Sequence, residues 1–114
     1  MITQNTIENI EEMIRTNKPL NENNKTQLLN LLATLKPEIA KLSNDQAEHA
    51  EHAESVAGFI ERSTHEALRQ DKNPTLLKLA IDGLSASVKG FEASHPQLVE
   101  NVNTIASALA NIGI

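Results

Sequence analysis

The densest group of side chains suited to chemistry lies at residues 48–54, in the run EHAEHAE. His49 and His52 are three residues apart and Glu48 precedes His52 by four, so one helix face could offer all three to a metal ion. Di-iron carboxylate bundles use a Glu-x-x-His spacing instead, which this run lacks because its three-residue spacings join like residues. The alternative, which we favour, is a solvated acidic face of an amphipathic helix.

A second group, Glu61, His65 and Arg69, has four-residue spacings that favour ordinary pairing on a helix surface. General acid–base catalysis needs a pocket and a second catalytic group, and the sequence indicates neither. The chain also has no glycine-rich phosphate loop and no serine in a nucleophile elbow. We therefore expect no catalytic residue, no bound cofactor and no enzymatic activity.

Composition excludes several further classes of function. The 114 residues carry a formal charge of −5, no cysteine and two phenylalanines as the only aromatic residues besides histidine. Nucleic acids and anionic membrane surfaces attract clustered Lys and Arg, which are absent, and disulfides and thiolate zinc sites are impossible. The start MITQNTIENI does not resemble a signal peptide, and no apolar run approaches the roughly 18 residues of a membrane span. We expect a cytoplasmic protein.

Apolar residues recur in steps of three and four along most of the chain, which predicts helices, whereas alternating strand patterns do not occur. The expected helices cover about 3–16, 21–42 and 44–71, and two more begin near 73 and 94. Short links predict antiparallel helical hairpins. The expected fold is one all-α domain over 1–114, a bundle of about five helices with a long alanine-rich helix in the middle. The strongest stripes are Leu28, Leu32, Leu35, Ile39 and Leu42; Leu77, Ile81, Leu84, Val88 and Phe91; and Leu98, Val102, Ile105, Leu109 and Ile112.

Several joints between these helices leave alternatives open. The apolar stripe continues through Pro37, which favours a kinked helix over a break. Ser43 and Gln46 have the spacing of a capping box, although the third helix could also continue from the second. Asn73 and Pro74 predict the start of the fourth helix. In the run SHPQ at 94–97, either the serine caps with the glutamine closing a box, or the histidine caps with the proline first inside. Position 113 is a glycine that fits a left-handed helix end.

The helix expected around 44–71 is unusual because alanines stand where the other helices have leucines. A thin seam of this kind buries little area alone and requires close neighbours, from this chain or from a second copy. We therefore predict a homodimer formed by coiled-coil-like helix packing. The residues predicted at the interface are Ala50, Ala53, Ala57 and Ile60.

The string FEASHP at 91–96 and the tail NIGI at 111–114 resemble the short bacterial proteins grouped as domain of unknown function family 4404. The apolar stripe between these two strings is similar to the family as well. The resemblance implies a small bacterial helical protein that opens with a helical hairpin. It brings no assigned activity and no functional residues.

Three hypotheses follow. The first is a non-enzymatic interaction or structural module that self-associates. The second is a metal-binding bundle that uses His49, His52 and nearby glutamates. The third is an adaptor whose acidic helices bind an unidentified, basic protein partner.

Overall fold

The computed structural model describes the backbone of residues 2–45 and 47–113, and the side chains of residues 4–44 and 51–113. Five helices follow one another along the chain: α1 (Ile2–Thr16), α2 (Glu22–Asp45), α3 (Ala47–Ala67), α4 (Pro74–Ser87) and α5 (Pro96–Ile112). The described residues contain no strand, so the predicted all-α fold of about five helices is confirmed.

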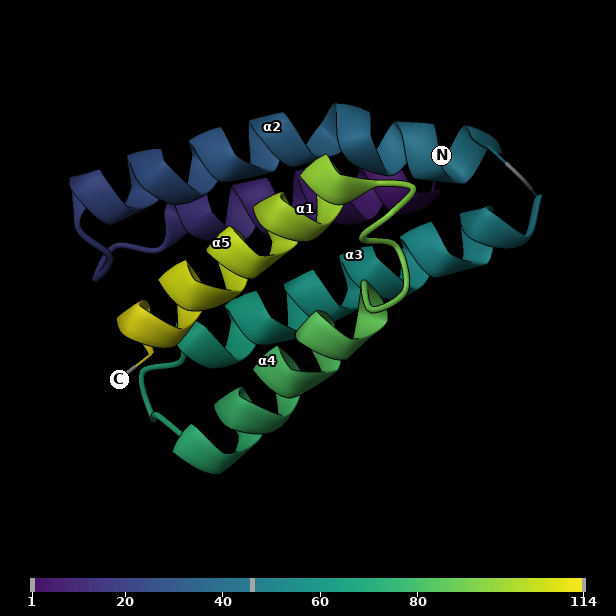
Figure 1. Cartoon of the computed structure of the whole chain (residues 1–114). Coiled ribbons are helices and arrows are strands. Elements are labelled where there is room, and N and C mark those ends of the chain that lie inside the picture. The colour runs from purple at the N-terminus through teal and green to yellow at the C-terminus, as the bar shows by residue number, and fades with distance from the viewer. Residues whose placement is uncertain (1, 46, 114) are drawn as a thin grey trace.

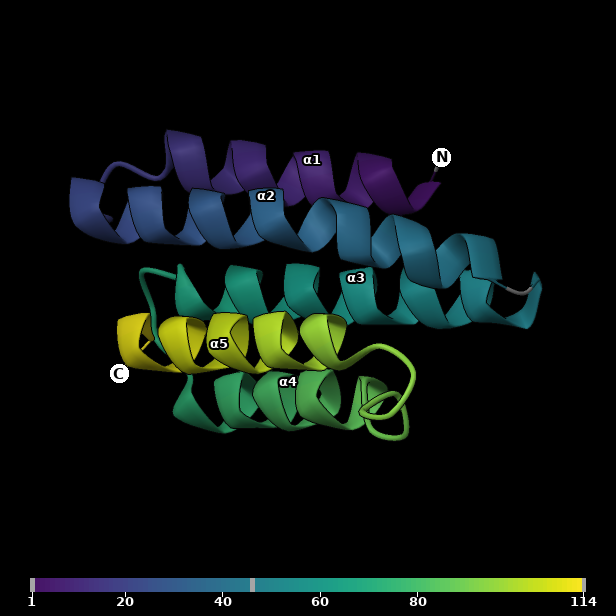
Figure 2. The same cartoon turned by 45° about the horizontal axis from the view of Figure 1, so that its top comes forward.

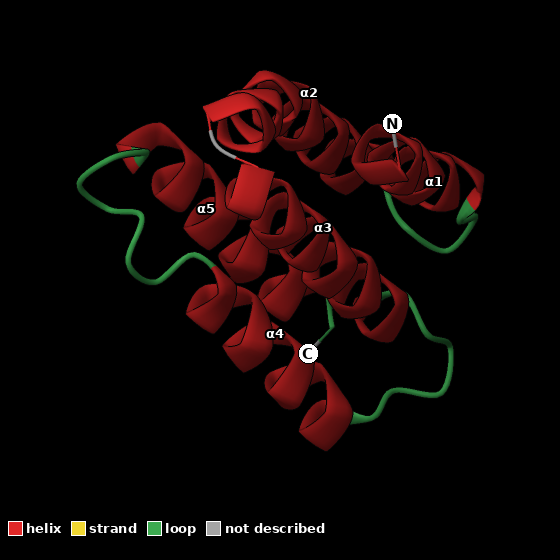
Figure 3. Cartoon of the chain, turned by 90° about the vertical axis from the view of Figure 1, so that its right-hand side faces the viewer, coloured by secondary structure: helices red, strands yellow, loops and turns green. Residues whose placement is uncertain are grey.

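The helix α3 lies at the centre of the bundle and contacts each of the other four helices (Figures 1 and 2). On one side it packs against the hairpin of α1 and α2, and on the other against α4 and α5. Among the described helices, α4 touches only α3 and α5, and α1 and α4 do not touch each other. Because α1 and α4 do not touch, part of α3 faces outward between them (Figure 3).

Small side chains explain how one helix has four neighbours. Ala53, Ala57 and Ala67 of α3 are fully buried, and with them lie Ser63 and Thr64. Short side chains allow neighbouring helix axes to approach, while the leucine and isoleucine stripes of those neighbours supply most of the buried area. The predicted stripes all enter this core, with Ile81, Phe91 and Ile112 only partly buried at its edge.

The second helix continues through Pro37, so one helix without a break is confirmed, while the predicted kink at the proline stays a prediction. The prediction of a cap at Ser43 is wrong, because α2 extends to Asp45 and encloses that residue. Its proposed partner Gln46 lies outside the described residues. The next helix begins at Ala47 and runs back along α2 (Figure 1), so the two do not form one continuous helix. At the other end, Asn21 caps α2 by accepting a hydrogen bond from the Asn24 amide at 2.8 Å.

The fourth helix begins as predicted but ends earlier. Asn73 accepts a hydrogen bond from the Leu76 amide at 3.1 Å, and Pro74 occupies the first turn. The stripe that continues to Phe91 in the sequence does not remain helical, because α4 ends at Ser87. The chain then turns through Gly90, whose φ of 99° is a left-handed conformation that glycine adopts without steric cost.

The glycine at the end of α5 has a different role from the one predicted. Gly113 has a φ of −83° and is right-handed, so the predicted left-handed cap is wrong. A Cβ atom at this position would lie 2.3 Å from Leu77 Cδ2 and 3.3 Å from Ala67 Cα. Glycine is therefore needed here because the C-terminal end of α5 packs closely against α3 and α4.

One buried ion pair joins the first two helices. Glu11 of α1 is 6% exposed, and its Oε1 lies 2.8 Å from Nζ of Lys36 on α2. A buried carboxylate needs such a partner, because its lost hydration would otherwise be uncompensated.

Replacing Gly113 with alanine should lower the free energy of unfolding by about 1–3 kcal/mol, because the added methyl group collides with Leu77 and the α3 backbone. Urea unfolding followed by circular dichroism measures the change. Asn111→Ala, an exposed substitution in the same turn, should remain within about 0.5 kcal/mol of the native chain. Equal stabilities for the two variants would contradict the close approach.

Replacing Lys36 with methionine should cost about 1–3 kcal/mol, because Glu11 is then buried without a partner. The lower part of this range is expected, since the Lys36 side chain is 35% exposed and water reaches the pair. Adding Glu11→Leu to Lys36→Met should recover much of the loss in the same urea experiment. A double variant no more stable than Lys36→Met would argue against the buried pair.

Candidate interaction surface

The predicted metal ligands do not form a described site. Glu48 and His49 lie in the part of α3 whose side chains are not described. His52 is exposed, and its ring meets the edge of Phe91 with centroids 5.5 Å apart. Among the residues that the structure describes, no three or more His, Asp or Glu side chains are grouped to hold a metal ion. Metal binding through Glu48, His49 and His52 thus remains a prediction.

His95 helps to position the link between α4 and α5. It is the N-cap residue of α5 with Pro96 first inside, so the second of the two predicted arrangements is the observed one. Its side chain makes no capping hydrogen bond; Nδ1 lies 3.0 Å from Ser94 Oγ, and the ring lies 6.0 Å from Phe91. The rings of His52 and His95 thus hold Phe91 from two sides, which fastens the link to the start of α3.

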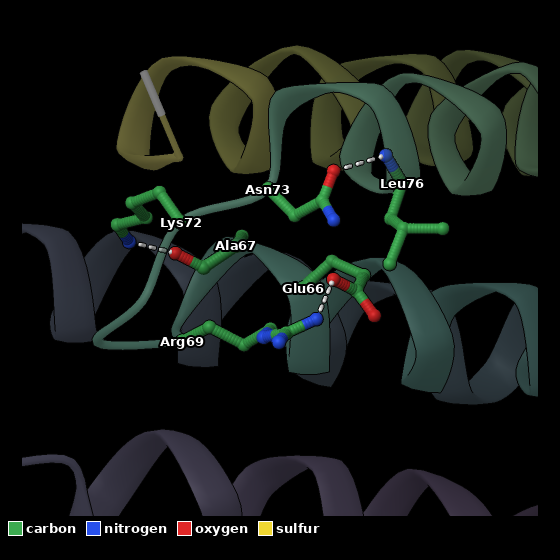
Figure 4. A network of polar contacts seen from close by, with 6 residues as sticks. All are labelled: Glu66, Ala67, Arg69, Lys72, Asn73 and Leu76. Carbon is green, nitrogen blue, oxygen red and sulfur yellow. Dashed lines mark hydrogen bonds and ion pairs between the residues drawn. The ribbon is translucent and has the colours of Figure 1, made fainter.

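The second group of polar residues lies on the outward face of α3. Arg69 pairs with Glu66 at 3.0 Å, and near it Lys72 Nζ donates to the Ala67 carbonyl at the end of α3, as Figure 4 shows. The Lys72 ammonium thus caps the C-terminal end of α3, where the helix dipole favours a positive charge. Glu61 and His65 lie nearby and line an open groove. Arg69 thus pairs with Glu66, three residues before it, whereas the described residues show no ion pair of His65 with Glu61 or Arg69 at the four-residue spacings that favoured pairing.

The outer side of α4 carries apolar side chains that face solvent. Leu77, Ala80 and Leu84 point into the core, whereas Leu76 is 42% and Leu79 is 63% exposed. These two leucines were not predicted as a surface, because the predicted apolar stripe of this helix begins at Leu77. The signal was present, since two leucines three residues apart lie off that stripe and share another face of the helix.

Phe59 of α3 extends this apolar surface across the boundary between the two helices. Its ring is 36% exposed and covers Gly83 of α4 so closely that a Cβ there would lie 2.5 Å from Phe59 Cε1. At the other end of α4, the Leu76 side chain lies beside Glu66 of α3 (Figure 4). Because α3 and α4 are antiparallel, Leu79 falls between these two contacts. We call Phe59, Leu76 and Leu79 the apolar ridge.

Figure 3 shows that α3 faces outward between α1 and α4. A groove lined by this side of α3 and by Met13 of α1 includes Phe59 of the ridge. It has a volume of about 860 Å³. Its floor is the outer face of α3, and Met13 of α1 forms part of its wall. The lining residues are Met13, Ser55, Gly58, Phe59, Glu61, Arg62, His65 and Glu66. Phe59 belongs to both features, so the groove and the ridge are continuous.

Ion pairs neutralise only part of the charge on this face. The Glu66–Arg69 pair lies beside the groove, Lys78 contacts Asp82 at 2.7 Å on α4, and Glu61 is followed by Arg62 in the groove. Glu54 and Glu51, four and seven residues before Gly58, add two exposed carboxylates to the same outward side of α3. Among these groups acidic side chains outnumber basic ones, as they do in the whole chain with its formal charge of −5.

The sequence model of the family described as Domain of unknown function (DUF4404) matches residues 28–114. The chain belongs to this family. The matched range begins within α2 and includes all of α3, α4 and α5, and it confirms the resemblance to this family. Neither a curated protein nor a solved structure matches the chain. No described helix of this DUF4404 chain is both long and apolar enough to cross a membrane.

Proposed function

We propose that this DUF4404 chain is a non-enzymatic interaction module that self-associates through the outer face of α3 and α4. The observation that carries the proposal is Leu79, a leucine 63% exposed that shares a face of α4 with the exposed Leu76. Burying a leucine contributes about 1.5–3 kcal/mol, so a second surface that covered the ridge would gain substantial free energy.

This location differs from the alanine seam predicted from the sequence. Ala53, Ala57 and Ile60 are fully buried within a single chain, and Ala50 lies among the residues whose side chains are not described. In the folded chain, these side chains are covered by the helices that pack against α3, so a second copy cannot reach them. Association through it remains a prediction that requires α3 to separate from those neighbours, whereas the ridge is open to a partner without rearrangement.

The rival proposal is that the same face binds a different protein. Self-association needs no additional component, and closed symmetric dimers are the commonest assemblies of soluble proteins. We therefore favour a second copy of the chain.

Light scattering coupled to gel filtration tests the proposal. The native chain should shift from a mass of 12.5 kDa toward twice that value as its concentration rises. Leu79→Glu should weaken the dimer by roughly tenfold or more, because burial of the leucine is lost and a charge must be desolvated.

Ala33→Glu is the matched control, since it adds the same charge at an exposed position of α2, away from the ridge. This variant should associate like the native chain, and both variants should unfold at nearly the same urea concentration as the native chain. A native protein that keeps the mass of one chain at high micromolar concentration would refute self-association.

A further inference from the structure

The outward side of α3 carries acidic and basic side chains at opposite ends. Glu51 and Glu54 precede Gly58 in this helix. Arg62 and His65 follow it. Steps of three and four residues place all five on one side of the helix, and each of them is exposed. We call these five residues the charged stripe, because the sign of its charge changes at its middle.

The two ends of the charged stripe are symmetric about Gly58. Glu54 and Arg62 are each four residues from the glycine, and Glu51 and His65 are each seven residues from it. If a second α3 lies antiparallel on this side, with a two-fold axis at Gly58, each position meets the one equally far beyond the glycine. Glu54 of one copy then faces Arg62 of the other. The charged stripe is therefore complementary to its own reversed copy.

The central charges of the stripe are available for contacts between chains. Among the described residues, neither Glu54 nor Arg62 belongs to an ion pair, whereas Glu66 and Arg69 beside them are paired at 3.0 Å. A contact between chains at Glu54 and Arg62 thus breaks no existing pair. It contributes a modest attraction at each of two symmetric places, and it fixes the register and direction of the helices.

The acidic excess of the whole face does not oppose this contact at close range. Antiparallel packing places the two Glu54 side chains eight residues apart along α3, or about 12 Å, where salt screens much of their repulsion. Each Glu54 lies instead at the level of Arg62. Of the acidic groups that flank the basic end, Glu66 is already paired with Arg69, and Glu61 is only partly exposed.

The middle of the charged stripe is open to the approach of a second helix. A Cβ at Gly58 would meet nothing within 4 Å, so the packing of the single chain does not require glycine there. Without a side chain at the axis, the two backbones can come close. In this arrangement α4 of both copies lies on the same side of the α3 pair. Phe59 of the ridge, one residue from the axis, is then placed near its counterpart.

Resting on the proposed self-association, we infer that its central contact is an antiparallel pair of α3 helices with a two-fold axis at Gly58. Glu54 of each copy contacts Arg62 of the other, and the outer positions Glu51 and His65 meet in the same way. The occupant of this face is a second copy, because the charge pattern of the stripe is the complement of itself.

Reversal of one charge tests the contact in a direction that net charge does not predict. Glu54→Arg should weaken the dimer by about tenfold in light scattering over a concentration series, because both symmetric contacts change from attraction to repulsion. The variant carries −3 in place of −5, so relief of general repulsion alone would strengthen association. Glu100→Arg is the matched control at an exposed position of α5, and it should not weaken the dimer.

A second reversal in the same chain should restore the contact. The double variant Glu54→Arg/Arg62→Glu keeps the native net charge and inverts the stripe, which is again complementary to its reversed copy. Its dimer should therefore be close to native in strength. Urea unfolding at a dilution where the chains are single verifies that each variant is folded. All should unfold near the native midpoint, because both positions are exposed.

The absence of cysteine allows an independent test of the axis. Gly58→Cys should form a disulfide with its own copy under mild oxidation, because the axis brings the two positions together. Ala33→Cys, at an exposed position of α2, is the control and should link far less. Masses identify the linked products.

The outcomes separate this inference from the proposed function. A native dimer that Glu54→Arg leaves unchanged, that the double reversal does not restore, or that Gly58→Cys links no more than the control overturns the α3 pair, while self-association stands. A native chain that remains single at all concentrations overturns both.

Discussion

The structure depends on one packing constraint, which is that α3 must contact four helices at once. A helix with leucines on every side would hold its neighbours too far apart to meet one another around it. Alanine, serine and threonine on the buried positions of α3 solve this problem, and the leucines and isoleucines of α1, α2, α4 and α5 then fill the interior. These short side chains each bury little area, but they allow the other four helices to pack closely around α3.

The same constraint explains why part of α3 is left open. Four helices of modest length do not encircle a fifth completely, and here the uncovered sector lies between α1 and α4, which do not touch. The groove is therefore a result of helix number and placement. Packing does not explain which residues surround the groove. These include a glycine in its floor and two exposed leucines on the neighbouring helix.

Much of the fold could be predicted from the sequence because three- and four-residue periodicity directly reports the buried side of a helix. The stripes of α2, α4 and α5 entered the core, and the Asn73–Pro74 start was found from its capping chemistry. Periodicity failed at Phe91, where an apolar residue keeps the phase but the backbone turns at Gly90. It failed at Gly113 because close approach of three helices is a property of their packing, which one segment does not reveal.

The candidate site was much harder to predict for a related reason. The sequence spacing predicted an interface at Ala53, Ala57 and Ile60. Whether such a stripe packs against its own chain or against another chain depends on helices that are distant in sequence. Leu76 and Leu79 lie off the stronger stripe of α4, and their exposure becomes evident only once the packing of all five helices is known.

The position of α1 has a consequence for the width of the groove. Its Met13 forms a wall of the groove, yet α1 precedes the range 28–114 over which the chain matches DUF4404. The floor on α3 and the ridge lie inside that range, so the groove is built from both parts of the chain. A substitution of Met13 alone would therefore change the width of the opening while its floor on α3 stays the same.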